Sequence, residues 1–109
     1  MKTTSARSDD MYLKLHEQGK DRVIALCDRE LLGGIFKQGQ LCLDLKKHRS
    51  FYEGELCTEE EAMPKLEGFA SINAVGKKSI SFLKKAGLLK GLGILIQGVP
   101  HAQVYRVKI

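Results

Sequence analysis

Short apolar segments, separated by glycine-containing polar turns, define the elements expected at the start of the chain. Residues 11–17 alternate loosely between apolar and polar, and residues 22–27 form a short apolar run. Residues 18–21, Gln-Gly-Lys-Asp, lie between them and are typical of a turn. Two short strands around a glycine turn predict a β-hairpin. Residues 41–45 alternate with a period of two, which predicts a third strand.

A first helix is expected in the middle of the chain. Thr58 and Glu61 have the spacing of a capping box, in which two side chains satisfy backbone N–H groups of the first helical turn. The helix is expected over residues 59–67, with Gly68 ending it. Pro64 lies inside this range, and proline removes a helical hydrogen bond. The helix is therefore expected to be short or bent.

A second helix is expected to begin near Gly76 and to end at Gly87, because glycine is favoured just after a helix. At about 100° per residue, this helix has two different faces. The face expected to pack inward carries Gly76, Ile80, Leu83 and Gly87. The other face carries Lys77, Lys78, Ser81, Lys84 and Lys85.

Strands are expected again at the end of the chain. Residues 92–97 predict a buried strand, residues 98–100 a turn, and residues 102–107 a closing strand. The order of strands, helices and strands, without βαβ alternation, favours a mostly antiparallel sheet. We therefore expect a single α+β domain over residues 11–109, with a small sheet of about five strands and two central helices packed on it. Residues 1–10 are polar and are expected to form a flexible tail.

Composition places the chain among cytoplasmic globular proteins. It has 109 residues, of which 43% are hydrophobic and 28% are charged. No apolar stretch approaches the roughly 20 residues that a membrane helix needs, and no secretory signal is apparent. The net charge is +5. A basic protein favours acidic partners, and RNA is the commonest of these in a cell.

The cysteines predict no metal site. Cys27, Cys42 and Cys57 lie fifteen residues apart, without the close Cys or His pairs from which zinc sites are built. Each lies where an apolar residue would also fit. We expect buried structural thiols, with no metal and no cofactor.

The start of the second helix has features of a phosphate site. Unpaired amide N–H groups at a helix N-terminus attract anions, and glycine lets a phosphate approach the backbone closely. Residues 72–83 resemble part of a helix-hairpin-helix, although Ala74 replaces the first glycine of that loop. The residues expected to contact RNA are Gly76, Lys77, Lys78, Lys84 and Lys85, with Lys46, Lys47 and Arg49 assisting. The alternative is that these lysines are a solvated face.

Two further groups of residues have alternative interpretations. Phe51 and Tyr52 follow a basic run and either stack on bases or pack on the core. His101 and Gln103 are two residues apart, so their side chains point to the same side of a strand. They are a possible ligand pocket, with Asp28 as a candidate carboxylate partner. Asp28 is also placed to cap a short helical turn before Gly33.

The chain resembles the archaeal domain of unknown function 424 family. The resemblance extends in order from Met11 to Ile109. It rests on residues 27–33 (CDRELLG), Phe36 with 39–43, residues 51–55 (FYEGE), residues 73–76 (NAVG) and, above all, residues 98–104 (GVPHAQV). It implies that Gly76, His101 and Gln103 belong to a family pattern, and it implies no activity, substrate or cofactor.

Three functions remain open from the sequence. The first is an RNA-binding module associated with translation or the ribosome, and the second is a protein–protein adaptor. The third is a small-ligand or enzyme pocket around His101 and Gln103. No catalytic motif is present, so an enzyme is the least favoured of the three.

Overall fold

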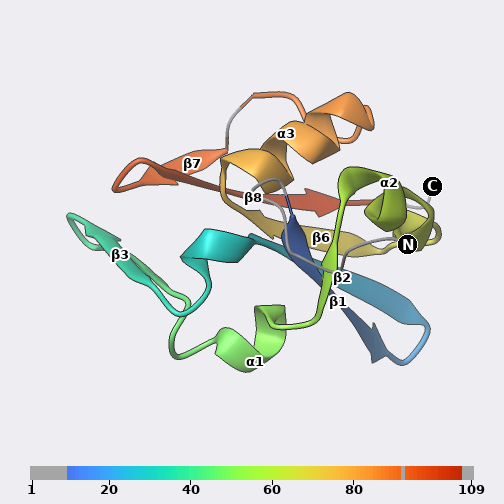
Figure 1. Ribbon diagram of the computed structural model, residues 1–109, viewed down its shortest axis with the longest axis horizontal. Helices are drawn as coiled ribbons and strands as arrows, with labels where there is room; N and C mark the ends of the chain where they lie inside the picture. Colours follow the sequence, from blue (N-terminus) through green and yellow to red (C-terminus); the bar gives the residue numbers. More distant parts are fainter. Residues whose placement is uncertain (1–9, 92, 107–109) are drawn as a thin grey trace, which may run out of the picture.

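The computed structural model of the protein describes residues 10–91 and 93–106. One mixed sheet of six strands has the order β5-β1-β2-β6-β8-β7, and two further strands pair separately (Figure 1). The strands of the large sheet are β1 (Met11–Gln18), β2 (Asp21–Asp28), β5 (Glu55–Cys57), β6 (Ser71–Val75), β7 (Ile94–Ile96) and β8 (Val99–Tyr105). The separate hairpin consists of β3 (Ile35–Gln38) and β4 (Leu41–Asp44).

The helices are short. The α-helices are α1 (Arg49–Tyr52), α2 (Glu59–Ala62) and α3 (Lys77–Lys85), and the 3₁₀ turns are η1 (Arg29–Leu31) and η2 (Met63–Leu66). The capping box at the start of α2 is confirmed, since Thr58 and Glu61 each accept the other's backbone N–H. The expected effect of Pro64 is also confirmed, because the α-helix gives way to η2 at the residue before it.

The α+β class is confirmed, but the finer description of the fold is only partly correct. The β1–β2 hairpin forms as expected around Gly19. The sheet is mixed, because β2 pairs in parallel with β6, a strand that was not predicted. Among the residues that the structure describes, α3, with 9 residues, is the one helix of substantial length over the sheet, since α2 has 4 residues. The likeness of residues 72–83 to half a helix-hairpin-helix is wrong, because residues 72–75 belong to β6.

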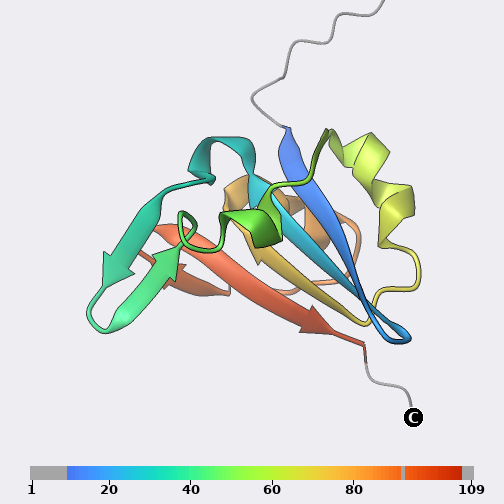
Figure 2. The same ribbon diagram turned by 90° about the horizontal axis from the view of Figure 1, so that it is seen from below.

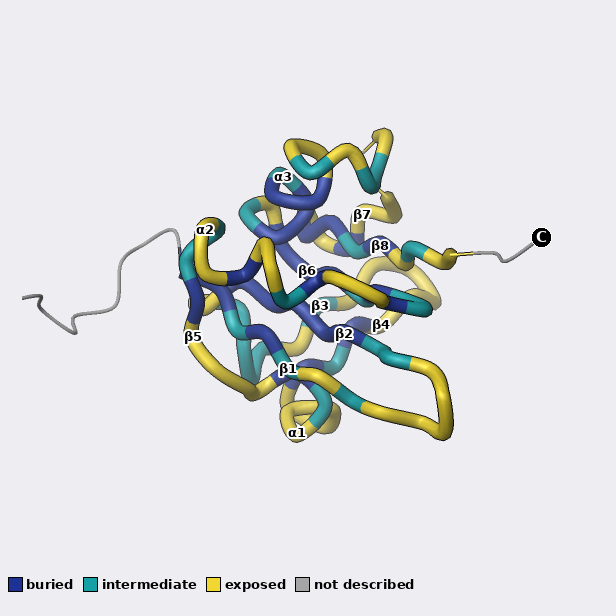
Figure 3. The backbone as a smooth tube through the Cα atoms, turned by 90° about the vertical axis from the view of Figure 1, so that its right-hand side faces the viewer, coloured by how far each residue is buried: buried dark blue, intermediate teal, exposed yellow. Residues whose placement is uncertain are grey.

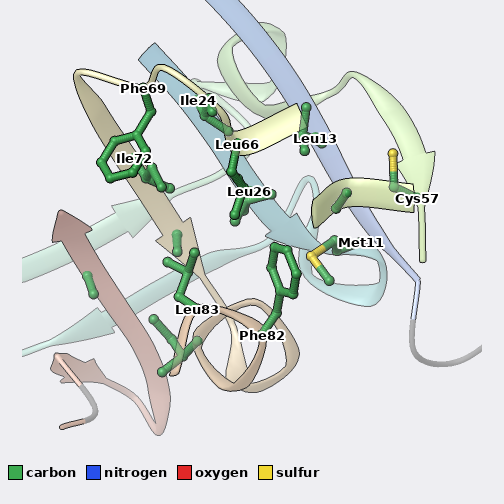
Figure 4. Packing of buried hydrophobic residues seen from close by; sticks show 14 residues of the cluster. Met11, Leu13, Ile24, Leu26, Cys57, Leu66, Phe69, Ile72, Phe82 and Leu83 are labelled. Atoms are coloured by element: carbon green, nitrogen blue, oxygen red, sulfur yellow. The ribbon is translucent and has the colours of Figure 1, made fainter. Parts of the chain in front are cut away.

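Both sides of the sheet are covered, so its central strands are buried on two faces. We call the side covered by α2 and α3 the α3 face, and the opposite side the α1 face. On the α3 face, buried side chains of the strands pack against Phe82 and Leu83 (Figure 4). On the α1 face, α1 and the β3–β4 hairpin lie over the sheet (Figure 2) and bury Leu45 and Tyr52. The buried segments therefore concentrate in β2, β6 and α3 (Figure 3).

The end of the chain differs from the prediction in two details. The strand expected to be buried over residues 92–97 is β7, which lies at the edge of the sheet with two of its three residues exposed. The turn comes earlier than expected, at Gln97 and Gly98, which both have positive φ. Leu92 and Val107 lie outside the described residues. So does the expected tail, except Asp10, whose side chain is buried.

The residues of β8 alternate between the two faces of the sheet. Ala102 and Val104 of β8 pack in the core of the α3 face, and the odd-numbered Val99 packs in the core of the α1 face. Within the described residues, no helix is long and apolar enough to cross a membrane.

Candidate binding site

The N-terminus of α3 is occupied by the side chain of Asp28. The Lys78 backbone N–H donates to Asp28 Oδ2 (3.0 Å), and the Ser79 backbone N–H donates to Oδ1 (2.8 Å). The Ser79 hydroxyl donates to Oδ1 as well (2.8 Å). Asp28 does not cap η1, as the sequence suggested, because its carboxylate points to α3 instead. The oxyanion expected at this helix N-terminus is therefore the protein's own.

Burial dominates the ionisation of this carboxyl group. Asp28 is buried, and desolvation raises the pKa of Asp28 above its usual range, because water no longer stabilises the charge. The hydrogen bonds from Lys78 and Ser79 oppose this shift. The nearby Glu30 carboxylate reinforces it.

Gly76 is required by the same contact. Its φ is +105°, in the region that side chains other than glycine rarely adopt. A Cβ atom at this position would lie 2.2 Å from Asp28 Cγ. Gly76 is buried against this carboxylate, so we assign it a structural role rather than the expected contact with phosphate.

The lysines of α3 share an outer surface, but two of them have acidic partners. Lys78 Nζ lies 3.0 Å from Glu30 Oε2, and Lys85 Nζ lies 3.2 Å from Glu59 Oε1. The side chains of Lys77 and Lys84 are exposed. The face therefore attracts polyanions less strongly than its lysine content suggests.

The second basic cluster lies on the other side of the sheet. Lys46, Lys47 and Arg49 are in and before α1, and Figure 1 shows α1 and α3 on opposite sides of the sheet. Arg49 Nε lies 2.8 Å from Glu53 Oε1. The backbone N–H groups of Lys46 and Lys47 donate to Asp44 Oδ1. This cluster does not extend the lysine face of α3.

The aromatic pair of α1 is used within the fold. The Phe51 ring stacks on His16, with centroids 4.5 Å apart and an interplanar angle of 9°. Tyr52 is buried, and burial raises its pKa to about 12. Of the two expected roles, packing is the one these contacts support.

The structure brings His101 and Gln103 together at a pocket. A shallow pocket of ≈ 320 Å³ lies beside β8. It is found where β8 continues beyond His101, the residue that pairs with Ile94 at the start of β7. Its lining comes from β8, the first residue of β7 and the loop before it, and consists of Leu89, Lys90, Gly93, Ile94, His101, Ala102, Gln103 and Tyr105. Asp28 does not line it, so the expected carboxylate partner is wrong. The lining contains Lys90 but no acidic side chain, which suits an anionic ligand.

A chain of hydrogen bonds holds the polar residues beside this pocket. Gln103 Nε2 donates to Asn73 Oδ1 (2.7 Å), and the Tyr105 hydroxyl donates to Gln103 Oε1 (3.0 Å). The Tyr105 side chain is 65% exposed, so its ring is presented to solvent in a defined orientation. Sequence reasoning missed Asn73, Lys90 and Tyr105 as site residues. Tyr105 could have been found from the two-residue period of a strand, which places it on the same side as Gln103. Asn73 could not, because only the pairing of β6 with β8 brings it next to Gln103.

The environment of His101 favours its neutral form. Its side chain is half-buried, and desolvation lowers the pKa of His101 below its usual range. A neutral imidazole offers one donor and one acceptor nitrogen. Lys90 is therefore the positive charge of the pocket.

Two of the three cysteines match the expectation of buried thiols. Cys27 and Cys57 are buried, whereas Cys42 is exposed on β4. Burial raises the pKa of Cys27 to about 12 and raises that of Cys57. Among residues 10–91 and 93–106, no three His, Cys, Asp or Glu side chains are placed to hold a metal ion.

Comparisons with known proteins confirm the resemblance found in the sequence. Residues 16–107 match the family described as protein of unknown function (DUF424). The chain is also similar to an uncharacterized conserved protein from Methanopyrus kandleri, known from a crystal structure. The two are 30% identical with a TM-score of 0.73, over 92% of this chain and 96% of the other. The comparison with curated proteins gives no match.

Replacing Gly76 by alanine is expected to lower the free energy of unfolding by about 3 kcal/mol or more, the sum of backbone strain and overpacking. Gly87→Ala is the matched control, since Gly87 also has positive φ (76°) but no atom within 4 Å of the place that a Cβ would occupy. Its expected loss is about 1–2 kcal/mol, from strain alone. Urea unfolding measures both, and equal losses would contradict the contact with Asp28.

Asp28→Asn is expected to lower the free energy of unfolding by about 1–3 kcal/mol, because its amide N–H groups then face backbone donors. The pKa of Asp28 is raised in the folded protein above its ordinary value of 3.8. The contribution of Asp28 to the free energy of unfolding is therefore complete below pH 3.8 and declines as the pH rises through the pKa of the folded protein. The difference from wild type should therefore be largest in acid. Asp44→Asn, at the end of β4, serves as the control and should change stability by less than about 0.5 kcal/mol, because the asparagine Oδ1 can still accept from the backbone N–H groups of Lys46 and Lys47.

One thiol of the native protein is expected to react rapidly with a disulfide reagent, because Cys42 is the exposed cysteine among the three. Counting released chromophore before and after unfolding checks this. Cys42→Ser should remove the rapid phase and leave the two slow thiols. A rapid phase that survives this substitution would show that Cys27 or Cys57 is accessible.

Proposed function

We propose that this protein, which belongs to the DUF424 family of proteins of unknown function, binds single-stranded RNA beside the outer residues of β8. The observation that carries the proposal is the exposed Tyr105 ring, tied to Gln103 and Asn73 and adjacent to the pocket that contains Lys90. The proposal keeps the expected partner and moves its site from α3 to β8.

Stacking is the first interaction on which the proposal rests. Unpaired RNA bases stack on aromatic side chains that are presented by sheets and shallow grooves. Tyr105 is exposed, and its hydroxyl is held by Gln103, so little rotational freedom is lost when a base packs on the ring. Phe51 and Tyr52 are engaged within the fold, which leaves Tyr105 as the better platform.

Polar contacts are the second interaction on which the proposal rests. The side-chain amides of Gln103 and Asn73 and the neutral imidazole of His101 provide donors and acceptors for base edges. Lys90 provides a cation for a phosphate, and the net charge of +5 attracts RNA from a distance. The pocket volume of ≈ 320 Å³ is at the lower end of ligand-site sizes, which suits one nucleotide rather than a folded RNA.

Association with the ribosome or with translation is the setting that we propose for this activity. This setting rests on the basic net charge of the chain and not on the pocket beside β8. Lys77 and Lys84 on α3 are the alternative RNA surface, because they are exposed and lie on one helix.

The test is fluorescence anisotropy with a labelled single-stranded oligoribonucleotide of mixed sequence. We expect binding that weakens only gradually with salt, because Lys90 is the cation that lines the site and the slope scales with the number of phosphate contacts. Tyr105→Ala should weaken it about tenfold or more, since one stacked base contributes about 1–3 kcal/mol. Tyr105→Phe should retain most of the affinity, because it keeps the ring.

The matched control is Lys77→Ala combined with Lys84→Ala, which removes two charges on the other side of the sheet. The proposal expects a smaller loss from this variant than from Tyr105→Ala. The opposite order would move the RNA surface to α3. Equal competition by a mononucleotide would indicate a small-ligand pocket, and no binding at low salt would end the RNA hypothesis.

A further inference from the structure

The outer edge of the sheet at β7 lacks charge. Residues 91–105 contain no Asp, Glu, Lys or Arg, in a chain whose residues are 28% charged. Ile94 and Leu95 are 57% and 45% exposed, one on each face of β7. Charged side chains on edge strands normally prevent pairing with other strands. β7 itself carries no such charge; the charged residue beside its turn is Lys37 of the β3–β4 hairpin, whose backbone N–H donates to Gln97 Oε1.

The other edges of the described strands are protected. β5, at the opposite end of the large sheet, carries Glu55, which is paired with Lys65. The β3–β4 hairpin carries Lys37 and Asp44. The absence of charge is therefore specific to β7 and the part of β8 that follows it.

The backbone of β7 has a free pairing position at its centre. Gly76 N–H donates to the Pro100 carbonyl, and Arg106 N–H donates to the Ala70 carbonyl, so even-numbered residues of β8 bond toward β6. Odd-numbered residues then bond toward β7, where Val99 pairs with Ile96 and His101 with Ile94. The backbone N–H and C=O of Leu95, between these two, point away from the sheet.

We propose that β7 pairs antiparallel with β7 of a second copy of this chain, about a twofold axis at Leu95. In this arrangement the Leu95 N–H of each copy donates to the Leu95 carbonyl of the other. The two Leu95 side chains meet on one face, and Ile94 of each copy lies across from Ile96 of the other on the opposite face. The large sheet becomes continuous through both copies.

Charge favours a second copy over other occupants. Two copies with a net charge of +5 repel each other, and this repulsion is smallest where the contacting surfaces carry no charge. An acidic protein would find no cation on β7 itself, since the cations beside it are Lys90 in the preceding loop and Lys37 of the β3–β4 hairpin. The proposal rests on β7 and not on Tyr105, and the two proposed surfaces meet at Ile94, which also lines the pocket.

The test is sedimentation equilibrium of the RNA-free protein over a wide concentration range. We expect a concentration-dependent equilibrium between one and two copies. Leu95→Lys should leave a monomer with unchanged circular dichroism, because it places two ammonium groups opposite each other. Leu56→Lys, at the protected β5 edge, is the matched control and should still dimerise.

Amide hydrogen exchange gives a readout that needs no variant. Exchange of the Leu95 N–H in the wild-type protein should slow as concentration rises, whereas that of Leu56 should not change. A wild-type monomer at every concentration, dimerisation that survives Leu95→Lys, or Leu95 exchange that is independent of concentration would each overturn the proposal. Stable association only with a different protein would do so as well.

Discussion

The contact between Asp28 and the N-terminus of α3 is the interaction on which the arrangement of this protein depends. A buried carboxylate needs donors, and the first turn of a helix has N–H groups without partners. Each satisfies the other here, through three hydrogen bonds from Lys78 and Ser79. The contact joins the end of β2 to the start of α3, and it requires glycine at position 76. Phe82 and Leu83 are thereby directed onto the sheet.

This contact also changes where a ligand is expected. A glycine followed by two lysines at a helix N-terminus is typical of a phosphate site, but the same geometry accepts an internal carboxylate. Once Asp28 occupies it, the lysines of α3 have lost the backbone amides that would have made them specific for phosphate. A cationic surface remains there, partly neutralised by Glu30 and Glu59.

The two proposals place function on β8 and its neighbour β7. One side of β8 completes the core with Ala102 and Val104, and on the other side Gln103 and Tyr105 face solvent beside the half-buried His101. Those residues include an imidazole, an amide and an exposed phenol. A twofold axis at β7, perpendicular to the sheet, would place the Tyr105 rings of both copies on the same side. An RNA strand long enough to reach both would then gain affinity through two linked contacts.

Local patterns determined much of this protein from its sequence alone: the β1–β2 hairpin, the capping box at Thr58, the limits of α3, the shared direction of His101 and Gln103, and the family. The first four depend on residues within one hairpin, one helix or one strand, and the family rests on several short motifs along the chain. The parallel pairing of β2 with β6 and the capping of α3 by Asp28 were decided by the tertiary structure. Asp28 lies 50 residues from Lys78. The free N–H groups of α3 attract any anion, so the sequence near the helix cannot distinguish a bound phosphate from a distant carboxylate that folding brings there.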